Sequence, residues 1–184
     1  FNCLAVDLRS GGKMKEVKNG TNRYAKRTGK GTSYVDALQD MTAALEYGRA
    51  EYAPAGTTIV AWGSSYSSAL VVHLAATHPE LVDGVVSFAP GEYFESLGKS
   101  ATWIQESAAT VKCPVFMTGA RAEEAQWRPI FEALATREKI GFVPETKGQH
   151  GSRALWPESD ASADYWKALE GFLDRYFPRE KKSD

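Results

Sequence analysis

The chain is poor in the features that mark several large classes of protein. Its 184 residues include two cysteines and three histidines, and no apolar run approaches the roughly 18 residues of a membrane span. The formal net charge is −1, so overall charge favours neither a nucleic-acid partner nor a membrane partner. No cluster of side chains has the spacing of a metal site. We therefore expect no nucleic-acid partner, no membrane span, no metal and no cofactor.

The two cysteines and the first residue leave the cellular compartment open. Cys3 and Cys113 each lie in an apolar run with strand character. We favour two buried free thiols, and a disulfide is the alternative, so a cytoplasmic and a secreted or periplasmic location both fit. The sequence enters a strand pattern directly at Phe1, without a targeting segment. We expect that something was removed from the front or that the sequence is part of a longer protein.

Strand and helix patterns alternate along the chain, which predicts an α/β protein with a mostly parallel sheet and helices on both faces. The expected strands cover residues 2–7, 57–62, 81–88, 111–118 and 139–143. Between them, helical patterns start at Ser33, directly after residue 67, near Trp103, near residue 125 and near residue 161. Residues 9–31 are basic and polar and predict a long exposed loop. We expect one domain over residues 1–178 and a disordered tail at 179–184.

The segment Gly63-Ser-Ser-Tyr-Ser67 lies between a strand and a helix. In the pattern G-x-S-x-G a sharp turn at that place lifts a nucleophilic serine above the sheet. Ser65 occupies the central position, and Ser67 replaces the second glycine. Ser64 is the alternative nucleophile if the frame slips by one residue. A serine-rich helix start that caps free amides is a competing interpretation of similar weight on these five residues alone.

A nucleophilic serine needs a base and an acid that orients the base. His150 lies in a glycine-flanked loop after the last strand, whereas His73 and His78 lie in or at the end of a helix. We therefore favour His150 as the base. The loop after residue 118 offers Glu123 as the first choice of acid and Glu124 as the alternative. Two acids in the first turn of a helix also complement its dipole, which is a competing interpretation.

Several motifs in this order resemble the α/β-hydrolase superfamily, nearest to its dienelactone-hydrolase and small-esterase branch. They comprise Leu4-Ala-Val-Asp-Leu-Arg-Ser-Gly-Gly12, the serine turn, strand ends at Phe88-Ala-Pro90 and Phe116-Met-Thr-Gly119, and Gly148-Gln-His-Gly151. The resemblance implies further strands before residue 2, supplied by an upstream segment or a second chain. In the family, a loop among those strands supplies one backbone N–H to the oxyanion hole. The residue after the nucleophile, here Tyr66, supplies the other.

These motifs predict a serine hydrolase that cleaves small-molecule carboxylic esters through an acyl-enzyme. A non-catalytic binding protein of the same fold is one alternative, and a serine peptidase or acyltransferase is another. About two dozen residues separate the third and fourth strands, which leaves no room for a large cap and indicates an open cleft. Tyr93, Phe94 and Trp103 are the candidate substrate-pocket residues, although aromatic side chains of the core would give the same pattern.

Overall fold

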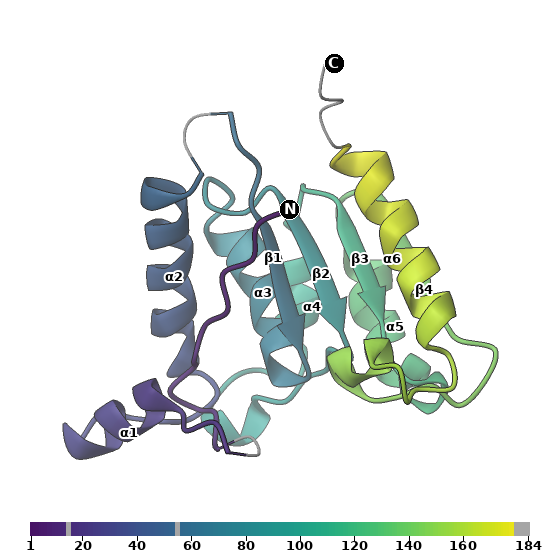
Figure 1. Ribbon diagram of the computed structural model, residues 1–184. Helices are drawn as coiled ribbons and strands as arrows, with labels where there is room; N and C mark the ends of the chain where they lie inside the picture. The colour runs from purple at the N-terminus through teal and green to yellow at the C-terminus, as the bar shows by residue number, and fades with distance from the viewer. Residues whose placement is uncertain (14–15, 54–55, 179–184) are drawn as a thin grey trace.

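The computed structural model describes residues 1–13, 16–53 and 56–178, and its centre is a sheet of four parallel strands (Figure 1). The strands lie in chain order, β1-β2-β3-β4. Their bounds are Val60–Ser64, Gly84–Phe88, Val115–Thr118 and Lys139–Phe142. The tail expected to be disordered, 179–184, lies outside the described residues. The four strands match four of the five expected ones, and their parallel pairing confirms the expected α/β class.

The two faces of the sheet bury separate clusters of apolar side chains. Successive residues of a strand point to opposite faces, so Val85 joins one cluster and Val86 the other. All residues of β2 and β3 are buried. Continuous apolar runs of this kind are typical of parallel strands that are covered on both faces.

Helices cover both faces of the sheet (Figure 1). One face carries α2 (Ala37–Glu51), α3 (Tyr66–Thr77), α4 (Trp103–Ala108) and α5 (Glu124–Ala133), and the other carries α6 (Ser162–Tyr176). Three short 3₁₀ helices occupy connections: η1 (Glu95–Leu97), η2 (Arg121–Glu123) and η3 (Gly151–Leu155). In the part of the chain that is described, no helix is long and apolar enough to cross a bilayer.

The N-terminal third differs from the sequence-based expectation. Residues 2–7 form no strand and are exposed, because they pair with no strand of the described sheet. Cys3 is consequently exposed, and the expectation of two buried thiols was wrong for it, although both cysteines are free. Cys113 is partly buried, and burial raises the pKa of its thiol to about 11.

The expected loop over 9–31 contains a helix, α1 (Gly20–Arg27). The side chain of Asn19 caps this helix by accepting the N–H of Asn22 at 2.7 Å. The next helix starts later than expected: α2 begins at Ala37, and Ser33 instead forms a turn with Asp36. In that turn the Ser33 N–H and hydroxyl both donate to the Asp36 carboxylate, at 2.8 and 2.6 Å.

Candidate active site

Ser65 stands between β1 and α3 in a backbone conformation that an L-residue rarely adopts. Its φ is 60° and its ψ is −133°. Such a conformation costs about 1–3 kcal/mol and persists only where the surroundings enforce it. Hydrogen bonds on both sides do so here: the Ser65 N–H donates to Phe88 O at 2.8 Å, and its carbonyl accepts the Ser68 N–H at 2.8 Å. The turn is therefore a strained elbow at the carboxyl end of the sheet.

Gly63 and Ser67, the small residues on either side of Ser65, suit the turn for different physical reasons. A Cβ on Gly63 would lie well under 3.0 Å from the Ser67 and Ser68 backbone, so the strand and helix approach too closely for any side chain. Ser67, at the place of the second glycine, contributes its hydroxyl to the turn. Its Oγ accepts the Ser64 N–H at 2.9 Å and donates to Ser64 O at 2.8 Å. Ser67, which replaces the second glycine of the motif, therefore stabilises the elbow through these two hydrogen bonds.

Glu123 and His150 meet because they follow the carboxyl ends of two neighbouring parallel strands, β3 and β4. His150 Nδ1 hydrogen-bonds to Glu123 Oε1, and Glu123 Oε2 accepts the Ala120 N–H at 2.8 Å. Both carboxylate oxygens are therefore engaged, which fixes the carboxylate and leaves His150 Nε2 free of it. Glu124 is occupied elsewhere, in an ion pair with Arg128 on α5. The geometry favours Glu123 over Glu124 as the partner of the imidazole.

The loop that carries His150 packs directly on the elbow. The Ser152 N–H donates to Ser64 Oγ at 2.9 Å, and Trp62 Nε1–H donates to Ser152 Oγ at 3.0 Å. Gly151 has a φ of +64°, and a Cβ there would lie well under 3.0 Å from Ser64 Oγ. Two β1 side chains, Trp62 and Ser64, therefore set the position of this loop.

A second contact supports the same loop from α6. Gly148 also has a φ of +64°, and a Cβ there would collide with the Tyr165 hydroxyl. That hydroxyl donates to Gly119 O at 2.9 Å. Burial is the main reason that the pKa of Tyr165 rises to about 12, and the charge of Glu123 adds to the rise. A neutral, fixed Tyr165 thus lies beneath the histidine loop and near the acid.

Ser65 and His150 are adjacent through their loops but are not hydrogen-bonded. A Cβ on Gly151 would lie 3.7 Å from Ser65 N, so the loop backbone touches the elbow. Among the described residues, no hydrogen bond joins Ser65 Oγ to the imidazole. Hydrogen bonds of this kind are often long before substrate binds. The Tyr66 N–H, at the start of α3, has no acceptor in the described residues and so remains available.

The Tyr66 side chain is held by the N-terminal segment. Its ring stacks on Tyr34, with centroids 4.0 Å apart and planes 5° from parallel. Its hydroxyl shares a 2.7 Å hydrogen bond with Ser10 Oγ. Next to Ser10, Arg9 forms an ion pair with Asp40 of α2 at 2.7 Å, and the bond to Asp40 raises the pKa of the guanidinium. The segment after residue 8 is thereby fixed beside the elbow.

The three candidate pocket residues have different locations. Tyr93 lies near the elbow, where its hydroxyl donates to Ala89 O at 2.8 Å. Phe94 is buried in the core at 1% exposure. Trp103 packs against the Phe94 ring and against His73 of α3, with centroids 4.9 and 4.4 Å apart. Only Tyr93 of the three therefore borders the elbow.

The other two histidines, His73 and His78, are engaged away from the Ser65 elbow. His73 Nδ1 lies 2.8 Å from Ser107 Oγ, and burial lowers the pKa of His73 to about 4. His78 ends α3 beside Glu80. Within the described ranges, no three His, Cys, Asp or Glu side chains are grouped as metal ligands are.

Comparison with solved structures identifies the fold. A Pyrococcus furiosus esterase aligns with a TM-score of 0.62 over 80% of this chain, at 15% identity. A dienelactone hydrolase from Anabaena variabilis gives 0.62 over 87% at 18% identity, and a Paleococcus ferrophilus monoacylglycerol lipase gives 0.59 over 80% at 14%. The matches cover 66%, 69% and 77% of those proteins respectively. The chain therefore has the α/β-hydrolase fold, as its motifs predicted. No family model and no curated protein matches the sequence.

Several residues that shape the site escaped the sequence analysis. Ser64 was considered only as an alternative nucleophile, yet its hydroxyl accepts a bond from the histidine loop. Trp62, in the expected strand 57–62, is 43% exposed, and its indole N–H donates to Ser152 Oγ in the same loop. Tyr165 carried no signal beyond helical periodicity. Contacts of this kind join segments far apart in the chain, and no local pattern encodes them.

Proposed function

We propose that the chain is a serine hydrolase that cleaves carboxylic esters through an acyl-enzyme. The observation that carries the proposal is the Glu123–His150 pair on a loop packed against the strained Ser65 elbow. A serine, an acid and a histidine in this chain order, here Ser65, Glu123 and His150, are the arrangement that α/β-hydrolases use. The esterases and the lipase among the structural neighbours share the fold and so agree with this assignment.

The reaction starts with proton transfer from Ser65 Oγ to His150 Nε2, while Oγ bonds to the ester carbonyl carbon. The carbonyl π electrons move to oxygen, and the Tyr66 N–H stabilises the resulting oxyanion. Glu123 holds Nδ1–H, which keeps the correct tautomer and stabilises the imidazolium. Collapse of the intermediate breaks the ester C–O bond, and His150 returns the proton to the leaving alcohol.

Water then repeats the sequence on the acyl-enzyme. His150 takes a proton from the water as its oxygen attacks the acyl carbon. The C–O bond to Ser65 breaks, Oγ regains its proton from the imidazolium, and the carboxylic acid leaves. The steps use the side chains of Ser65, Glu123 and His150 and the backbone N–H of Tyr66, and the net change is ester plus water to acid plus alcohol.

An active-site label tests the proposal directly. A fluorophosphonate should react with the wild-type protein, and peptide mass spectrometry should place the adduct on Ser65 rather than on Ser64 or Ser67. Ser65→Ala should lose both labelling and p-nitrophenyl acetate hydrolysis. Ser100→Ala is the matched control, because Ser100 is exposed and bonds Glu106 outside the site. A wild-type protein that is not labelled would overturn the proposal.

Substrate class separates the esterase from its nearest alternative on the same fold. An aminoacyl p-nitroanilide presents an amide bond and a p-nitrophenyl ester presents an ester bond, and cleavage releases yellow p-nitroaniline from the first and yellow p-nitrophenolate from the second. We expect turnover of the ester and little turnover of the anilide. Preference for the anilide would instead assign a peptidase with the same serine.

A further inference from the structure

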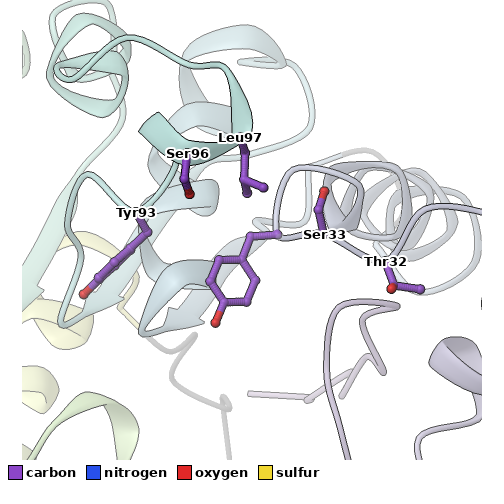
Figure 2. A pocket seen from close by; sticks show the side chains of 6 residues that line it. Thr32, Ser33, Tyr93, Ser96 and Leu97 are labelled. Carbon is purple, nitrogen blue, oxygen red and sulfur yellow. The ribbon is translucent and has the colours of Figure 1, made fainter.

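A small pocket lies beside the elbow, between two segments far apart in the chain (Figure 2). Thr32, Ser33 and Tyr34, which precede α2, form one side, and Tyr93, Ser96 and Leu97, which follow β2, form the other. Its volume is about 230 Å³. This is below the range of about 300–1,000 Å³ that holds a drug-sized molecule. One ring or a short chain therefore fills it.

Both tyrosines of the pocket are tied to residues next to the proposed nucleophile. Tyr34 stacks on Tyr66, which directly follows Ser65. The hydroxyl of Tyr93 donates to Ala89 O, and Ala89 follows Phe88, whose carbonyl accepts the Ser65 N–H. A group held between these rings is therefore close to an ester bond presented to Ser65.

The lining of the pocket is uncharged and rich in hydroxyl groups. Five of its six side chains carry a hydroxyl, and none carries a charge. The hydroxyls of Tyr93 and Ser33 are engaged within the chain. Those of Thr32, Tyr34 and Ser96 have no hydrogen-bond partner among the described residues. Three free donors disfavour a plain hydrocarbon, and the absence of a counter-charge disfavours an ion.

The shape of the pocket favours a flat group. One face of the Tyr34 ring is covered by Tyr66, and the residue remains 42% exposed. A ring that lies on the open face extends the existing stack, since aromatic faces accept both aromatic rings and the C–H face of a sugar. From these observations we infer that the pocket binds an uncharged, hydroxyl-bearing ring of the ester substrate, either phenolic or sugar. The inference rests on the proposed esterase function.

Two matched pairs of esters test the inference and distinguish the two sources of the ring. Methyl 4-hydroxybenzoate is compared with methyl benzoate, and 6-O-acetylglucose with cyclohexylmethyl acetate, with acid release measured by pH-stat. Each neutral hydrogen bond to the ring should raise kcat/KM by about three- to tenfold. We expect one hydroxylated ester to exceed its partner by about tenfold. Preference in the first pair assigns a phenol, and preference in the second assigns a sugar.

Variants of the lining connect that preference to the pocket. Tyr34→Phe and Ser96→Ala should each lower kcat/KM for the preferred hydroxylated ester about three- to tenfold and should lower it clearly less for the hydroxyl-free partner, which makes no hydrogen bond to the hydroxyl that is removed. Tyr176→Phe is the matched control, because Tyr176 ends α6 at the opposite end of the sheet (Figure 1). Equal turnover within both pairs, or equal losses for both members of the preferred pair, would overturn the inference.

Fluorophosphonate labelling tests the esterase proposal separately from the pocket inference. If Ser65 is labelled and p-nitrophenyl acetate is hydrolysed while neither hydroxylated ester is preferred, the pocket inference fails and the esterase proposal stands. If Ser65 is not labelled, both fail. Labelling together with a hydroxyl-dependent preference that Tyr34→Phe removes supports both.

Discussion

Gly151→Ala should displace the histidine loop from the Ser65 elbow. Gly151 has a φ of +64°, a conformation that costs an alanine about 1–2 kcal/mol. The new Cβ would also lie well under 3.0 Å from Ser64 Oγ, so the loop must move away. That movement breaks the 2.9 Å bond from the Ser152 N–H to Ser64 Oγ, worth about 0.5–1.5 kcal/mol. We expect a total loss of about 1.5–3.5 kcal/mol of local stability.

The loss should appear in catalysis before it appears in global unfolding. A displacement of about 1 Å in a reacting group can cost about 100-fold in rate. We therefore expect kcat for p-nitrophenyl acetate to fall about 100-fold with KM nearly unchanged, while the urea midpoint falls modestly. Gly171→Ala is the matched control: Gly171 lies in α6, a Cβ there meets nothing within 4 Å, and the variant should gain up to about 1 kcal/mol.

A double variant separates the collision from the backbone strain. Ser64→Ala removes the Oγ that the new methyl group would meet and alone costs one hydrogen bond. Because both single variants lose the same hydrogen bond, the double variant should cost about 0.5–1.5 kcal/mol less than the sum of the two single effects, and it should recover part of the lost kcat. Additive effects in this cycle, or a Gly151→Ala variant with wild-type kcat, would refute the account of the loop given above.

Four further predictions concern other parts of the chain. Glu123→Gln should lower kcat about 10²–10⁴-fold, because it removes the carboxylate that holds His150. Glu124→Gln loses only a surface ion pair with Arg128, and its kcat should stay within about twofold of the wild-type value. If steady-state kinetics show the large loss for Glu124→Gln instead, Glu124 is the acid. Burial lowers the pKa of His73 to about 4 in the folded protein. As the pH falls, the unfolded chain therefore takes up a proton at this histidine before the folded protein does, and the free energy of unfolding should decline between about pH 6.5 and about pH 4. The urea midpoint of His73→Gln should fall less over that pH interval than the wild-type midpoint does. An equal fall in both proteins would contradict the lowered pKa of His73. Ser67→Ala should cost about 1–2 kcal/mol in urea unfolding, because it leaves the Ser64 N–H without its acceptor, and a neutral variant would remove the explanation of this departure from the motif. At pH 8 a maleimide should modify exposed Cys3 well before Cys113, whose thiol pKa is raised to about 11 by burial, and mass spectrometry showing equal rates would count against that burial.

The sequence predicted the elements whose local pattern is decisive. Residues 84–88 and 115–118 are mostly apolar and buried throughout, as is typical of strands covered on both faces, and the residues around Ser65 combine a strand end with small side chains. Residues 2–7 show the same apolar character but form no strand, because a strand requires a partner that local composition does not reveal. Helix α1 was not predicted, because Ala25 is its only buried residue and its sequence therefore lacks the apolar stripe that indicates a helix.

Within the site, the sequence did not show which way adjacent side chains point or which distant segments they contact. Glu123 and Glu124 are adjacent, and the 3₁₀ turn that ends at Glu123 directs one toward His150 and the other toward Arg128. Likewise, aromatic character did not distinguish Tyr93 at the pocket from Phe94 in the core. The roles of Ser65, His150 and Glu123 in catalysis remain predictions that the labelling experiment and the variants will test.

The bond from Trp62 to Ser152 has a consequence for following the protein as it folds. The two residues are 90 positions apart in the chain, and their contact exists only when the histidine loop has docked on β1. Trp62 is also half-exposed and stacked parallel to Phe88, so its emission is sensitive to that docking. The difference in fluorescence between the wild type and Trp62→Phe therefore gives an optical signal for loop docking, one that needs no substrate and should rise together with recovered ester turnover during refolding.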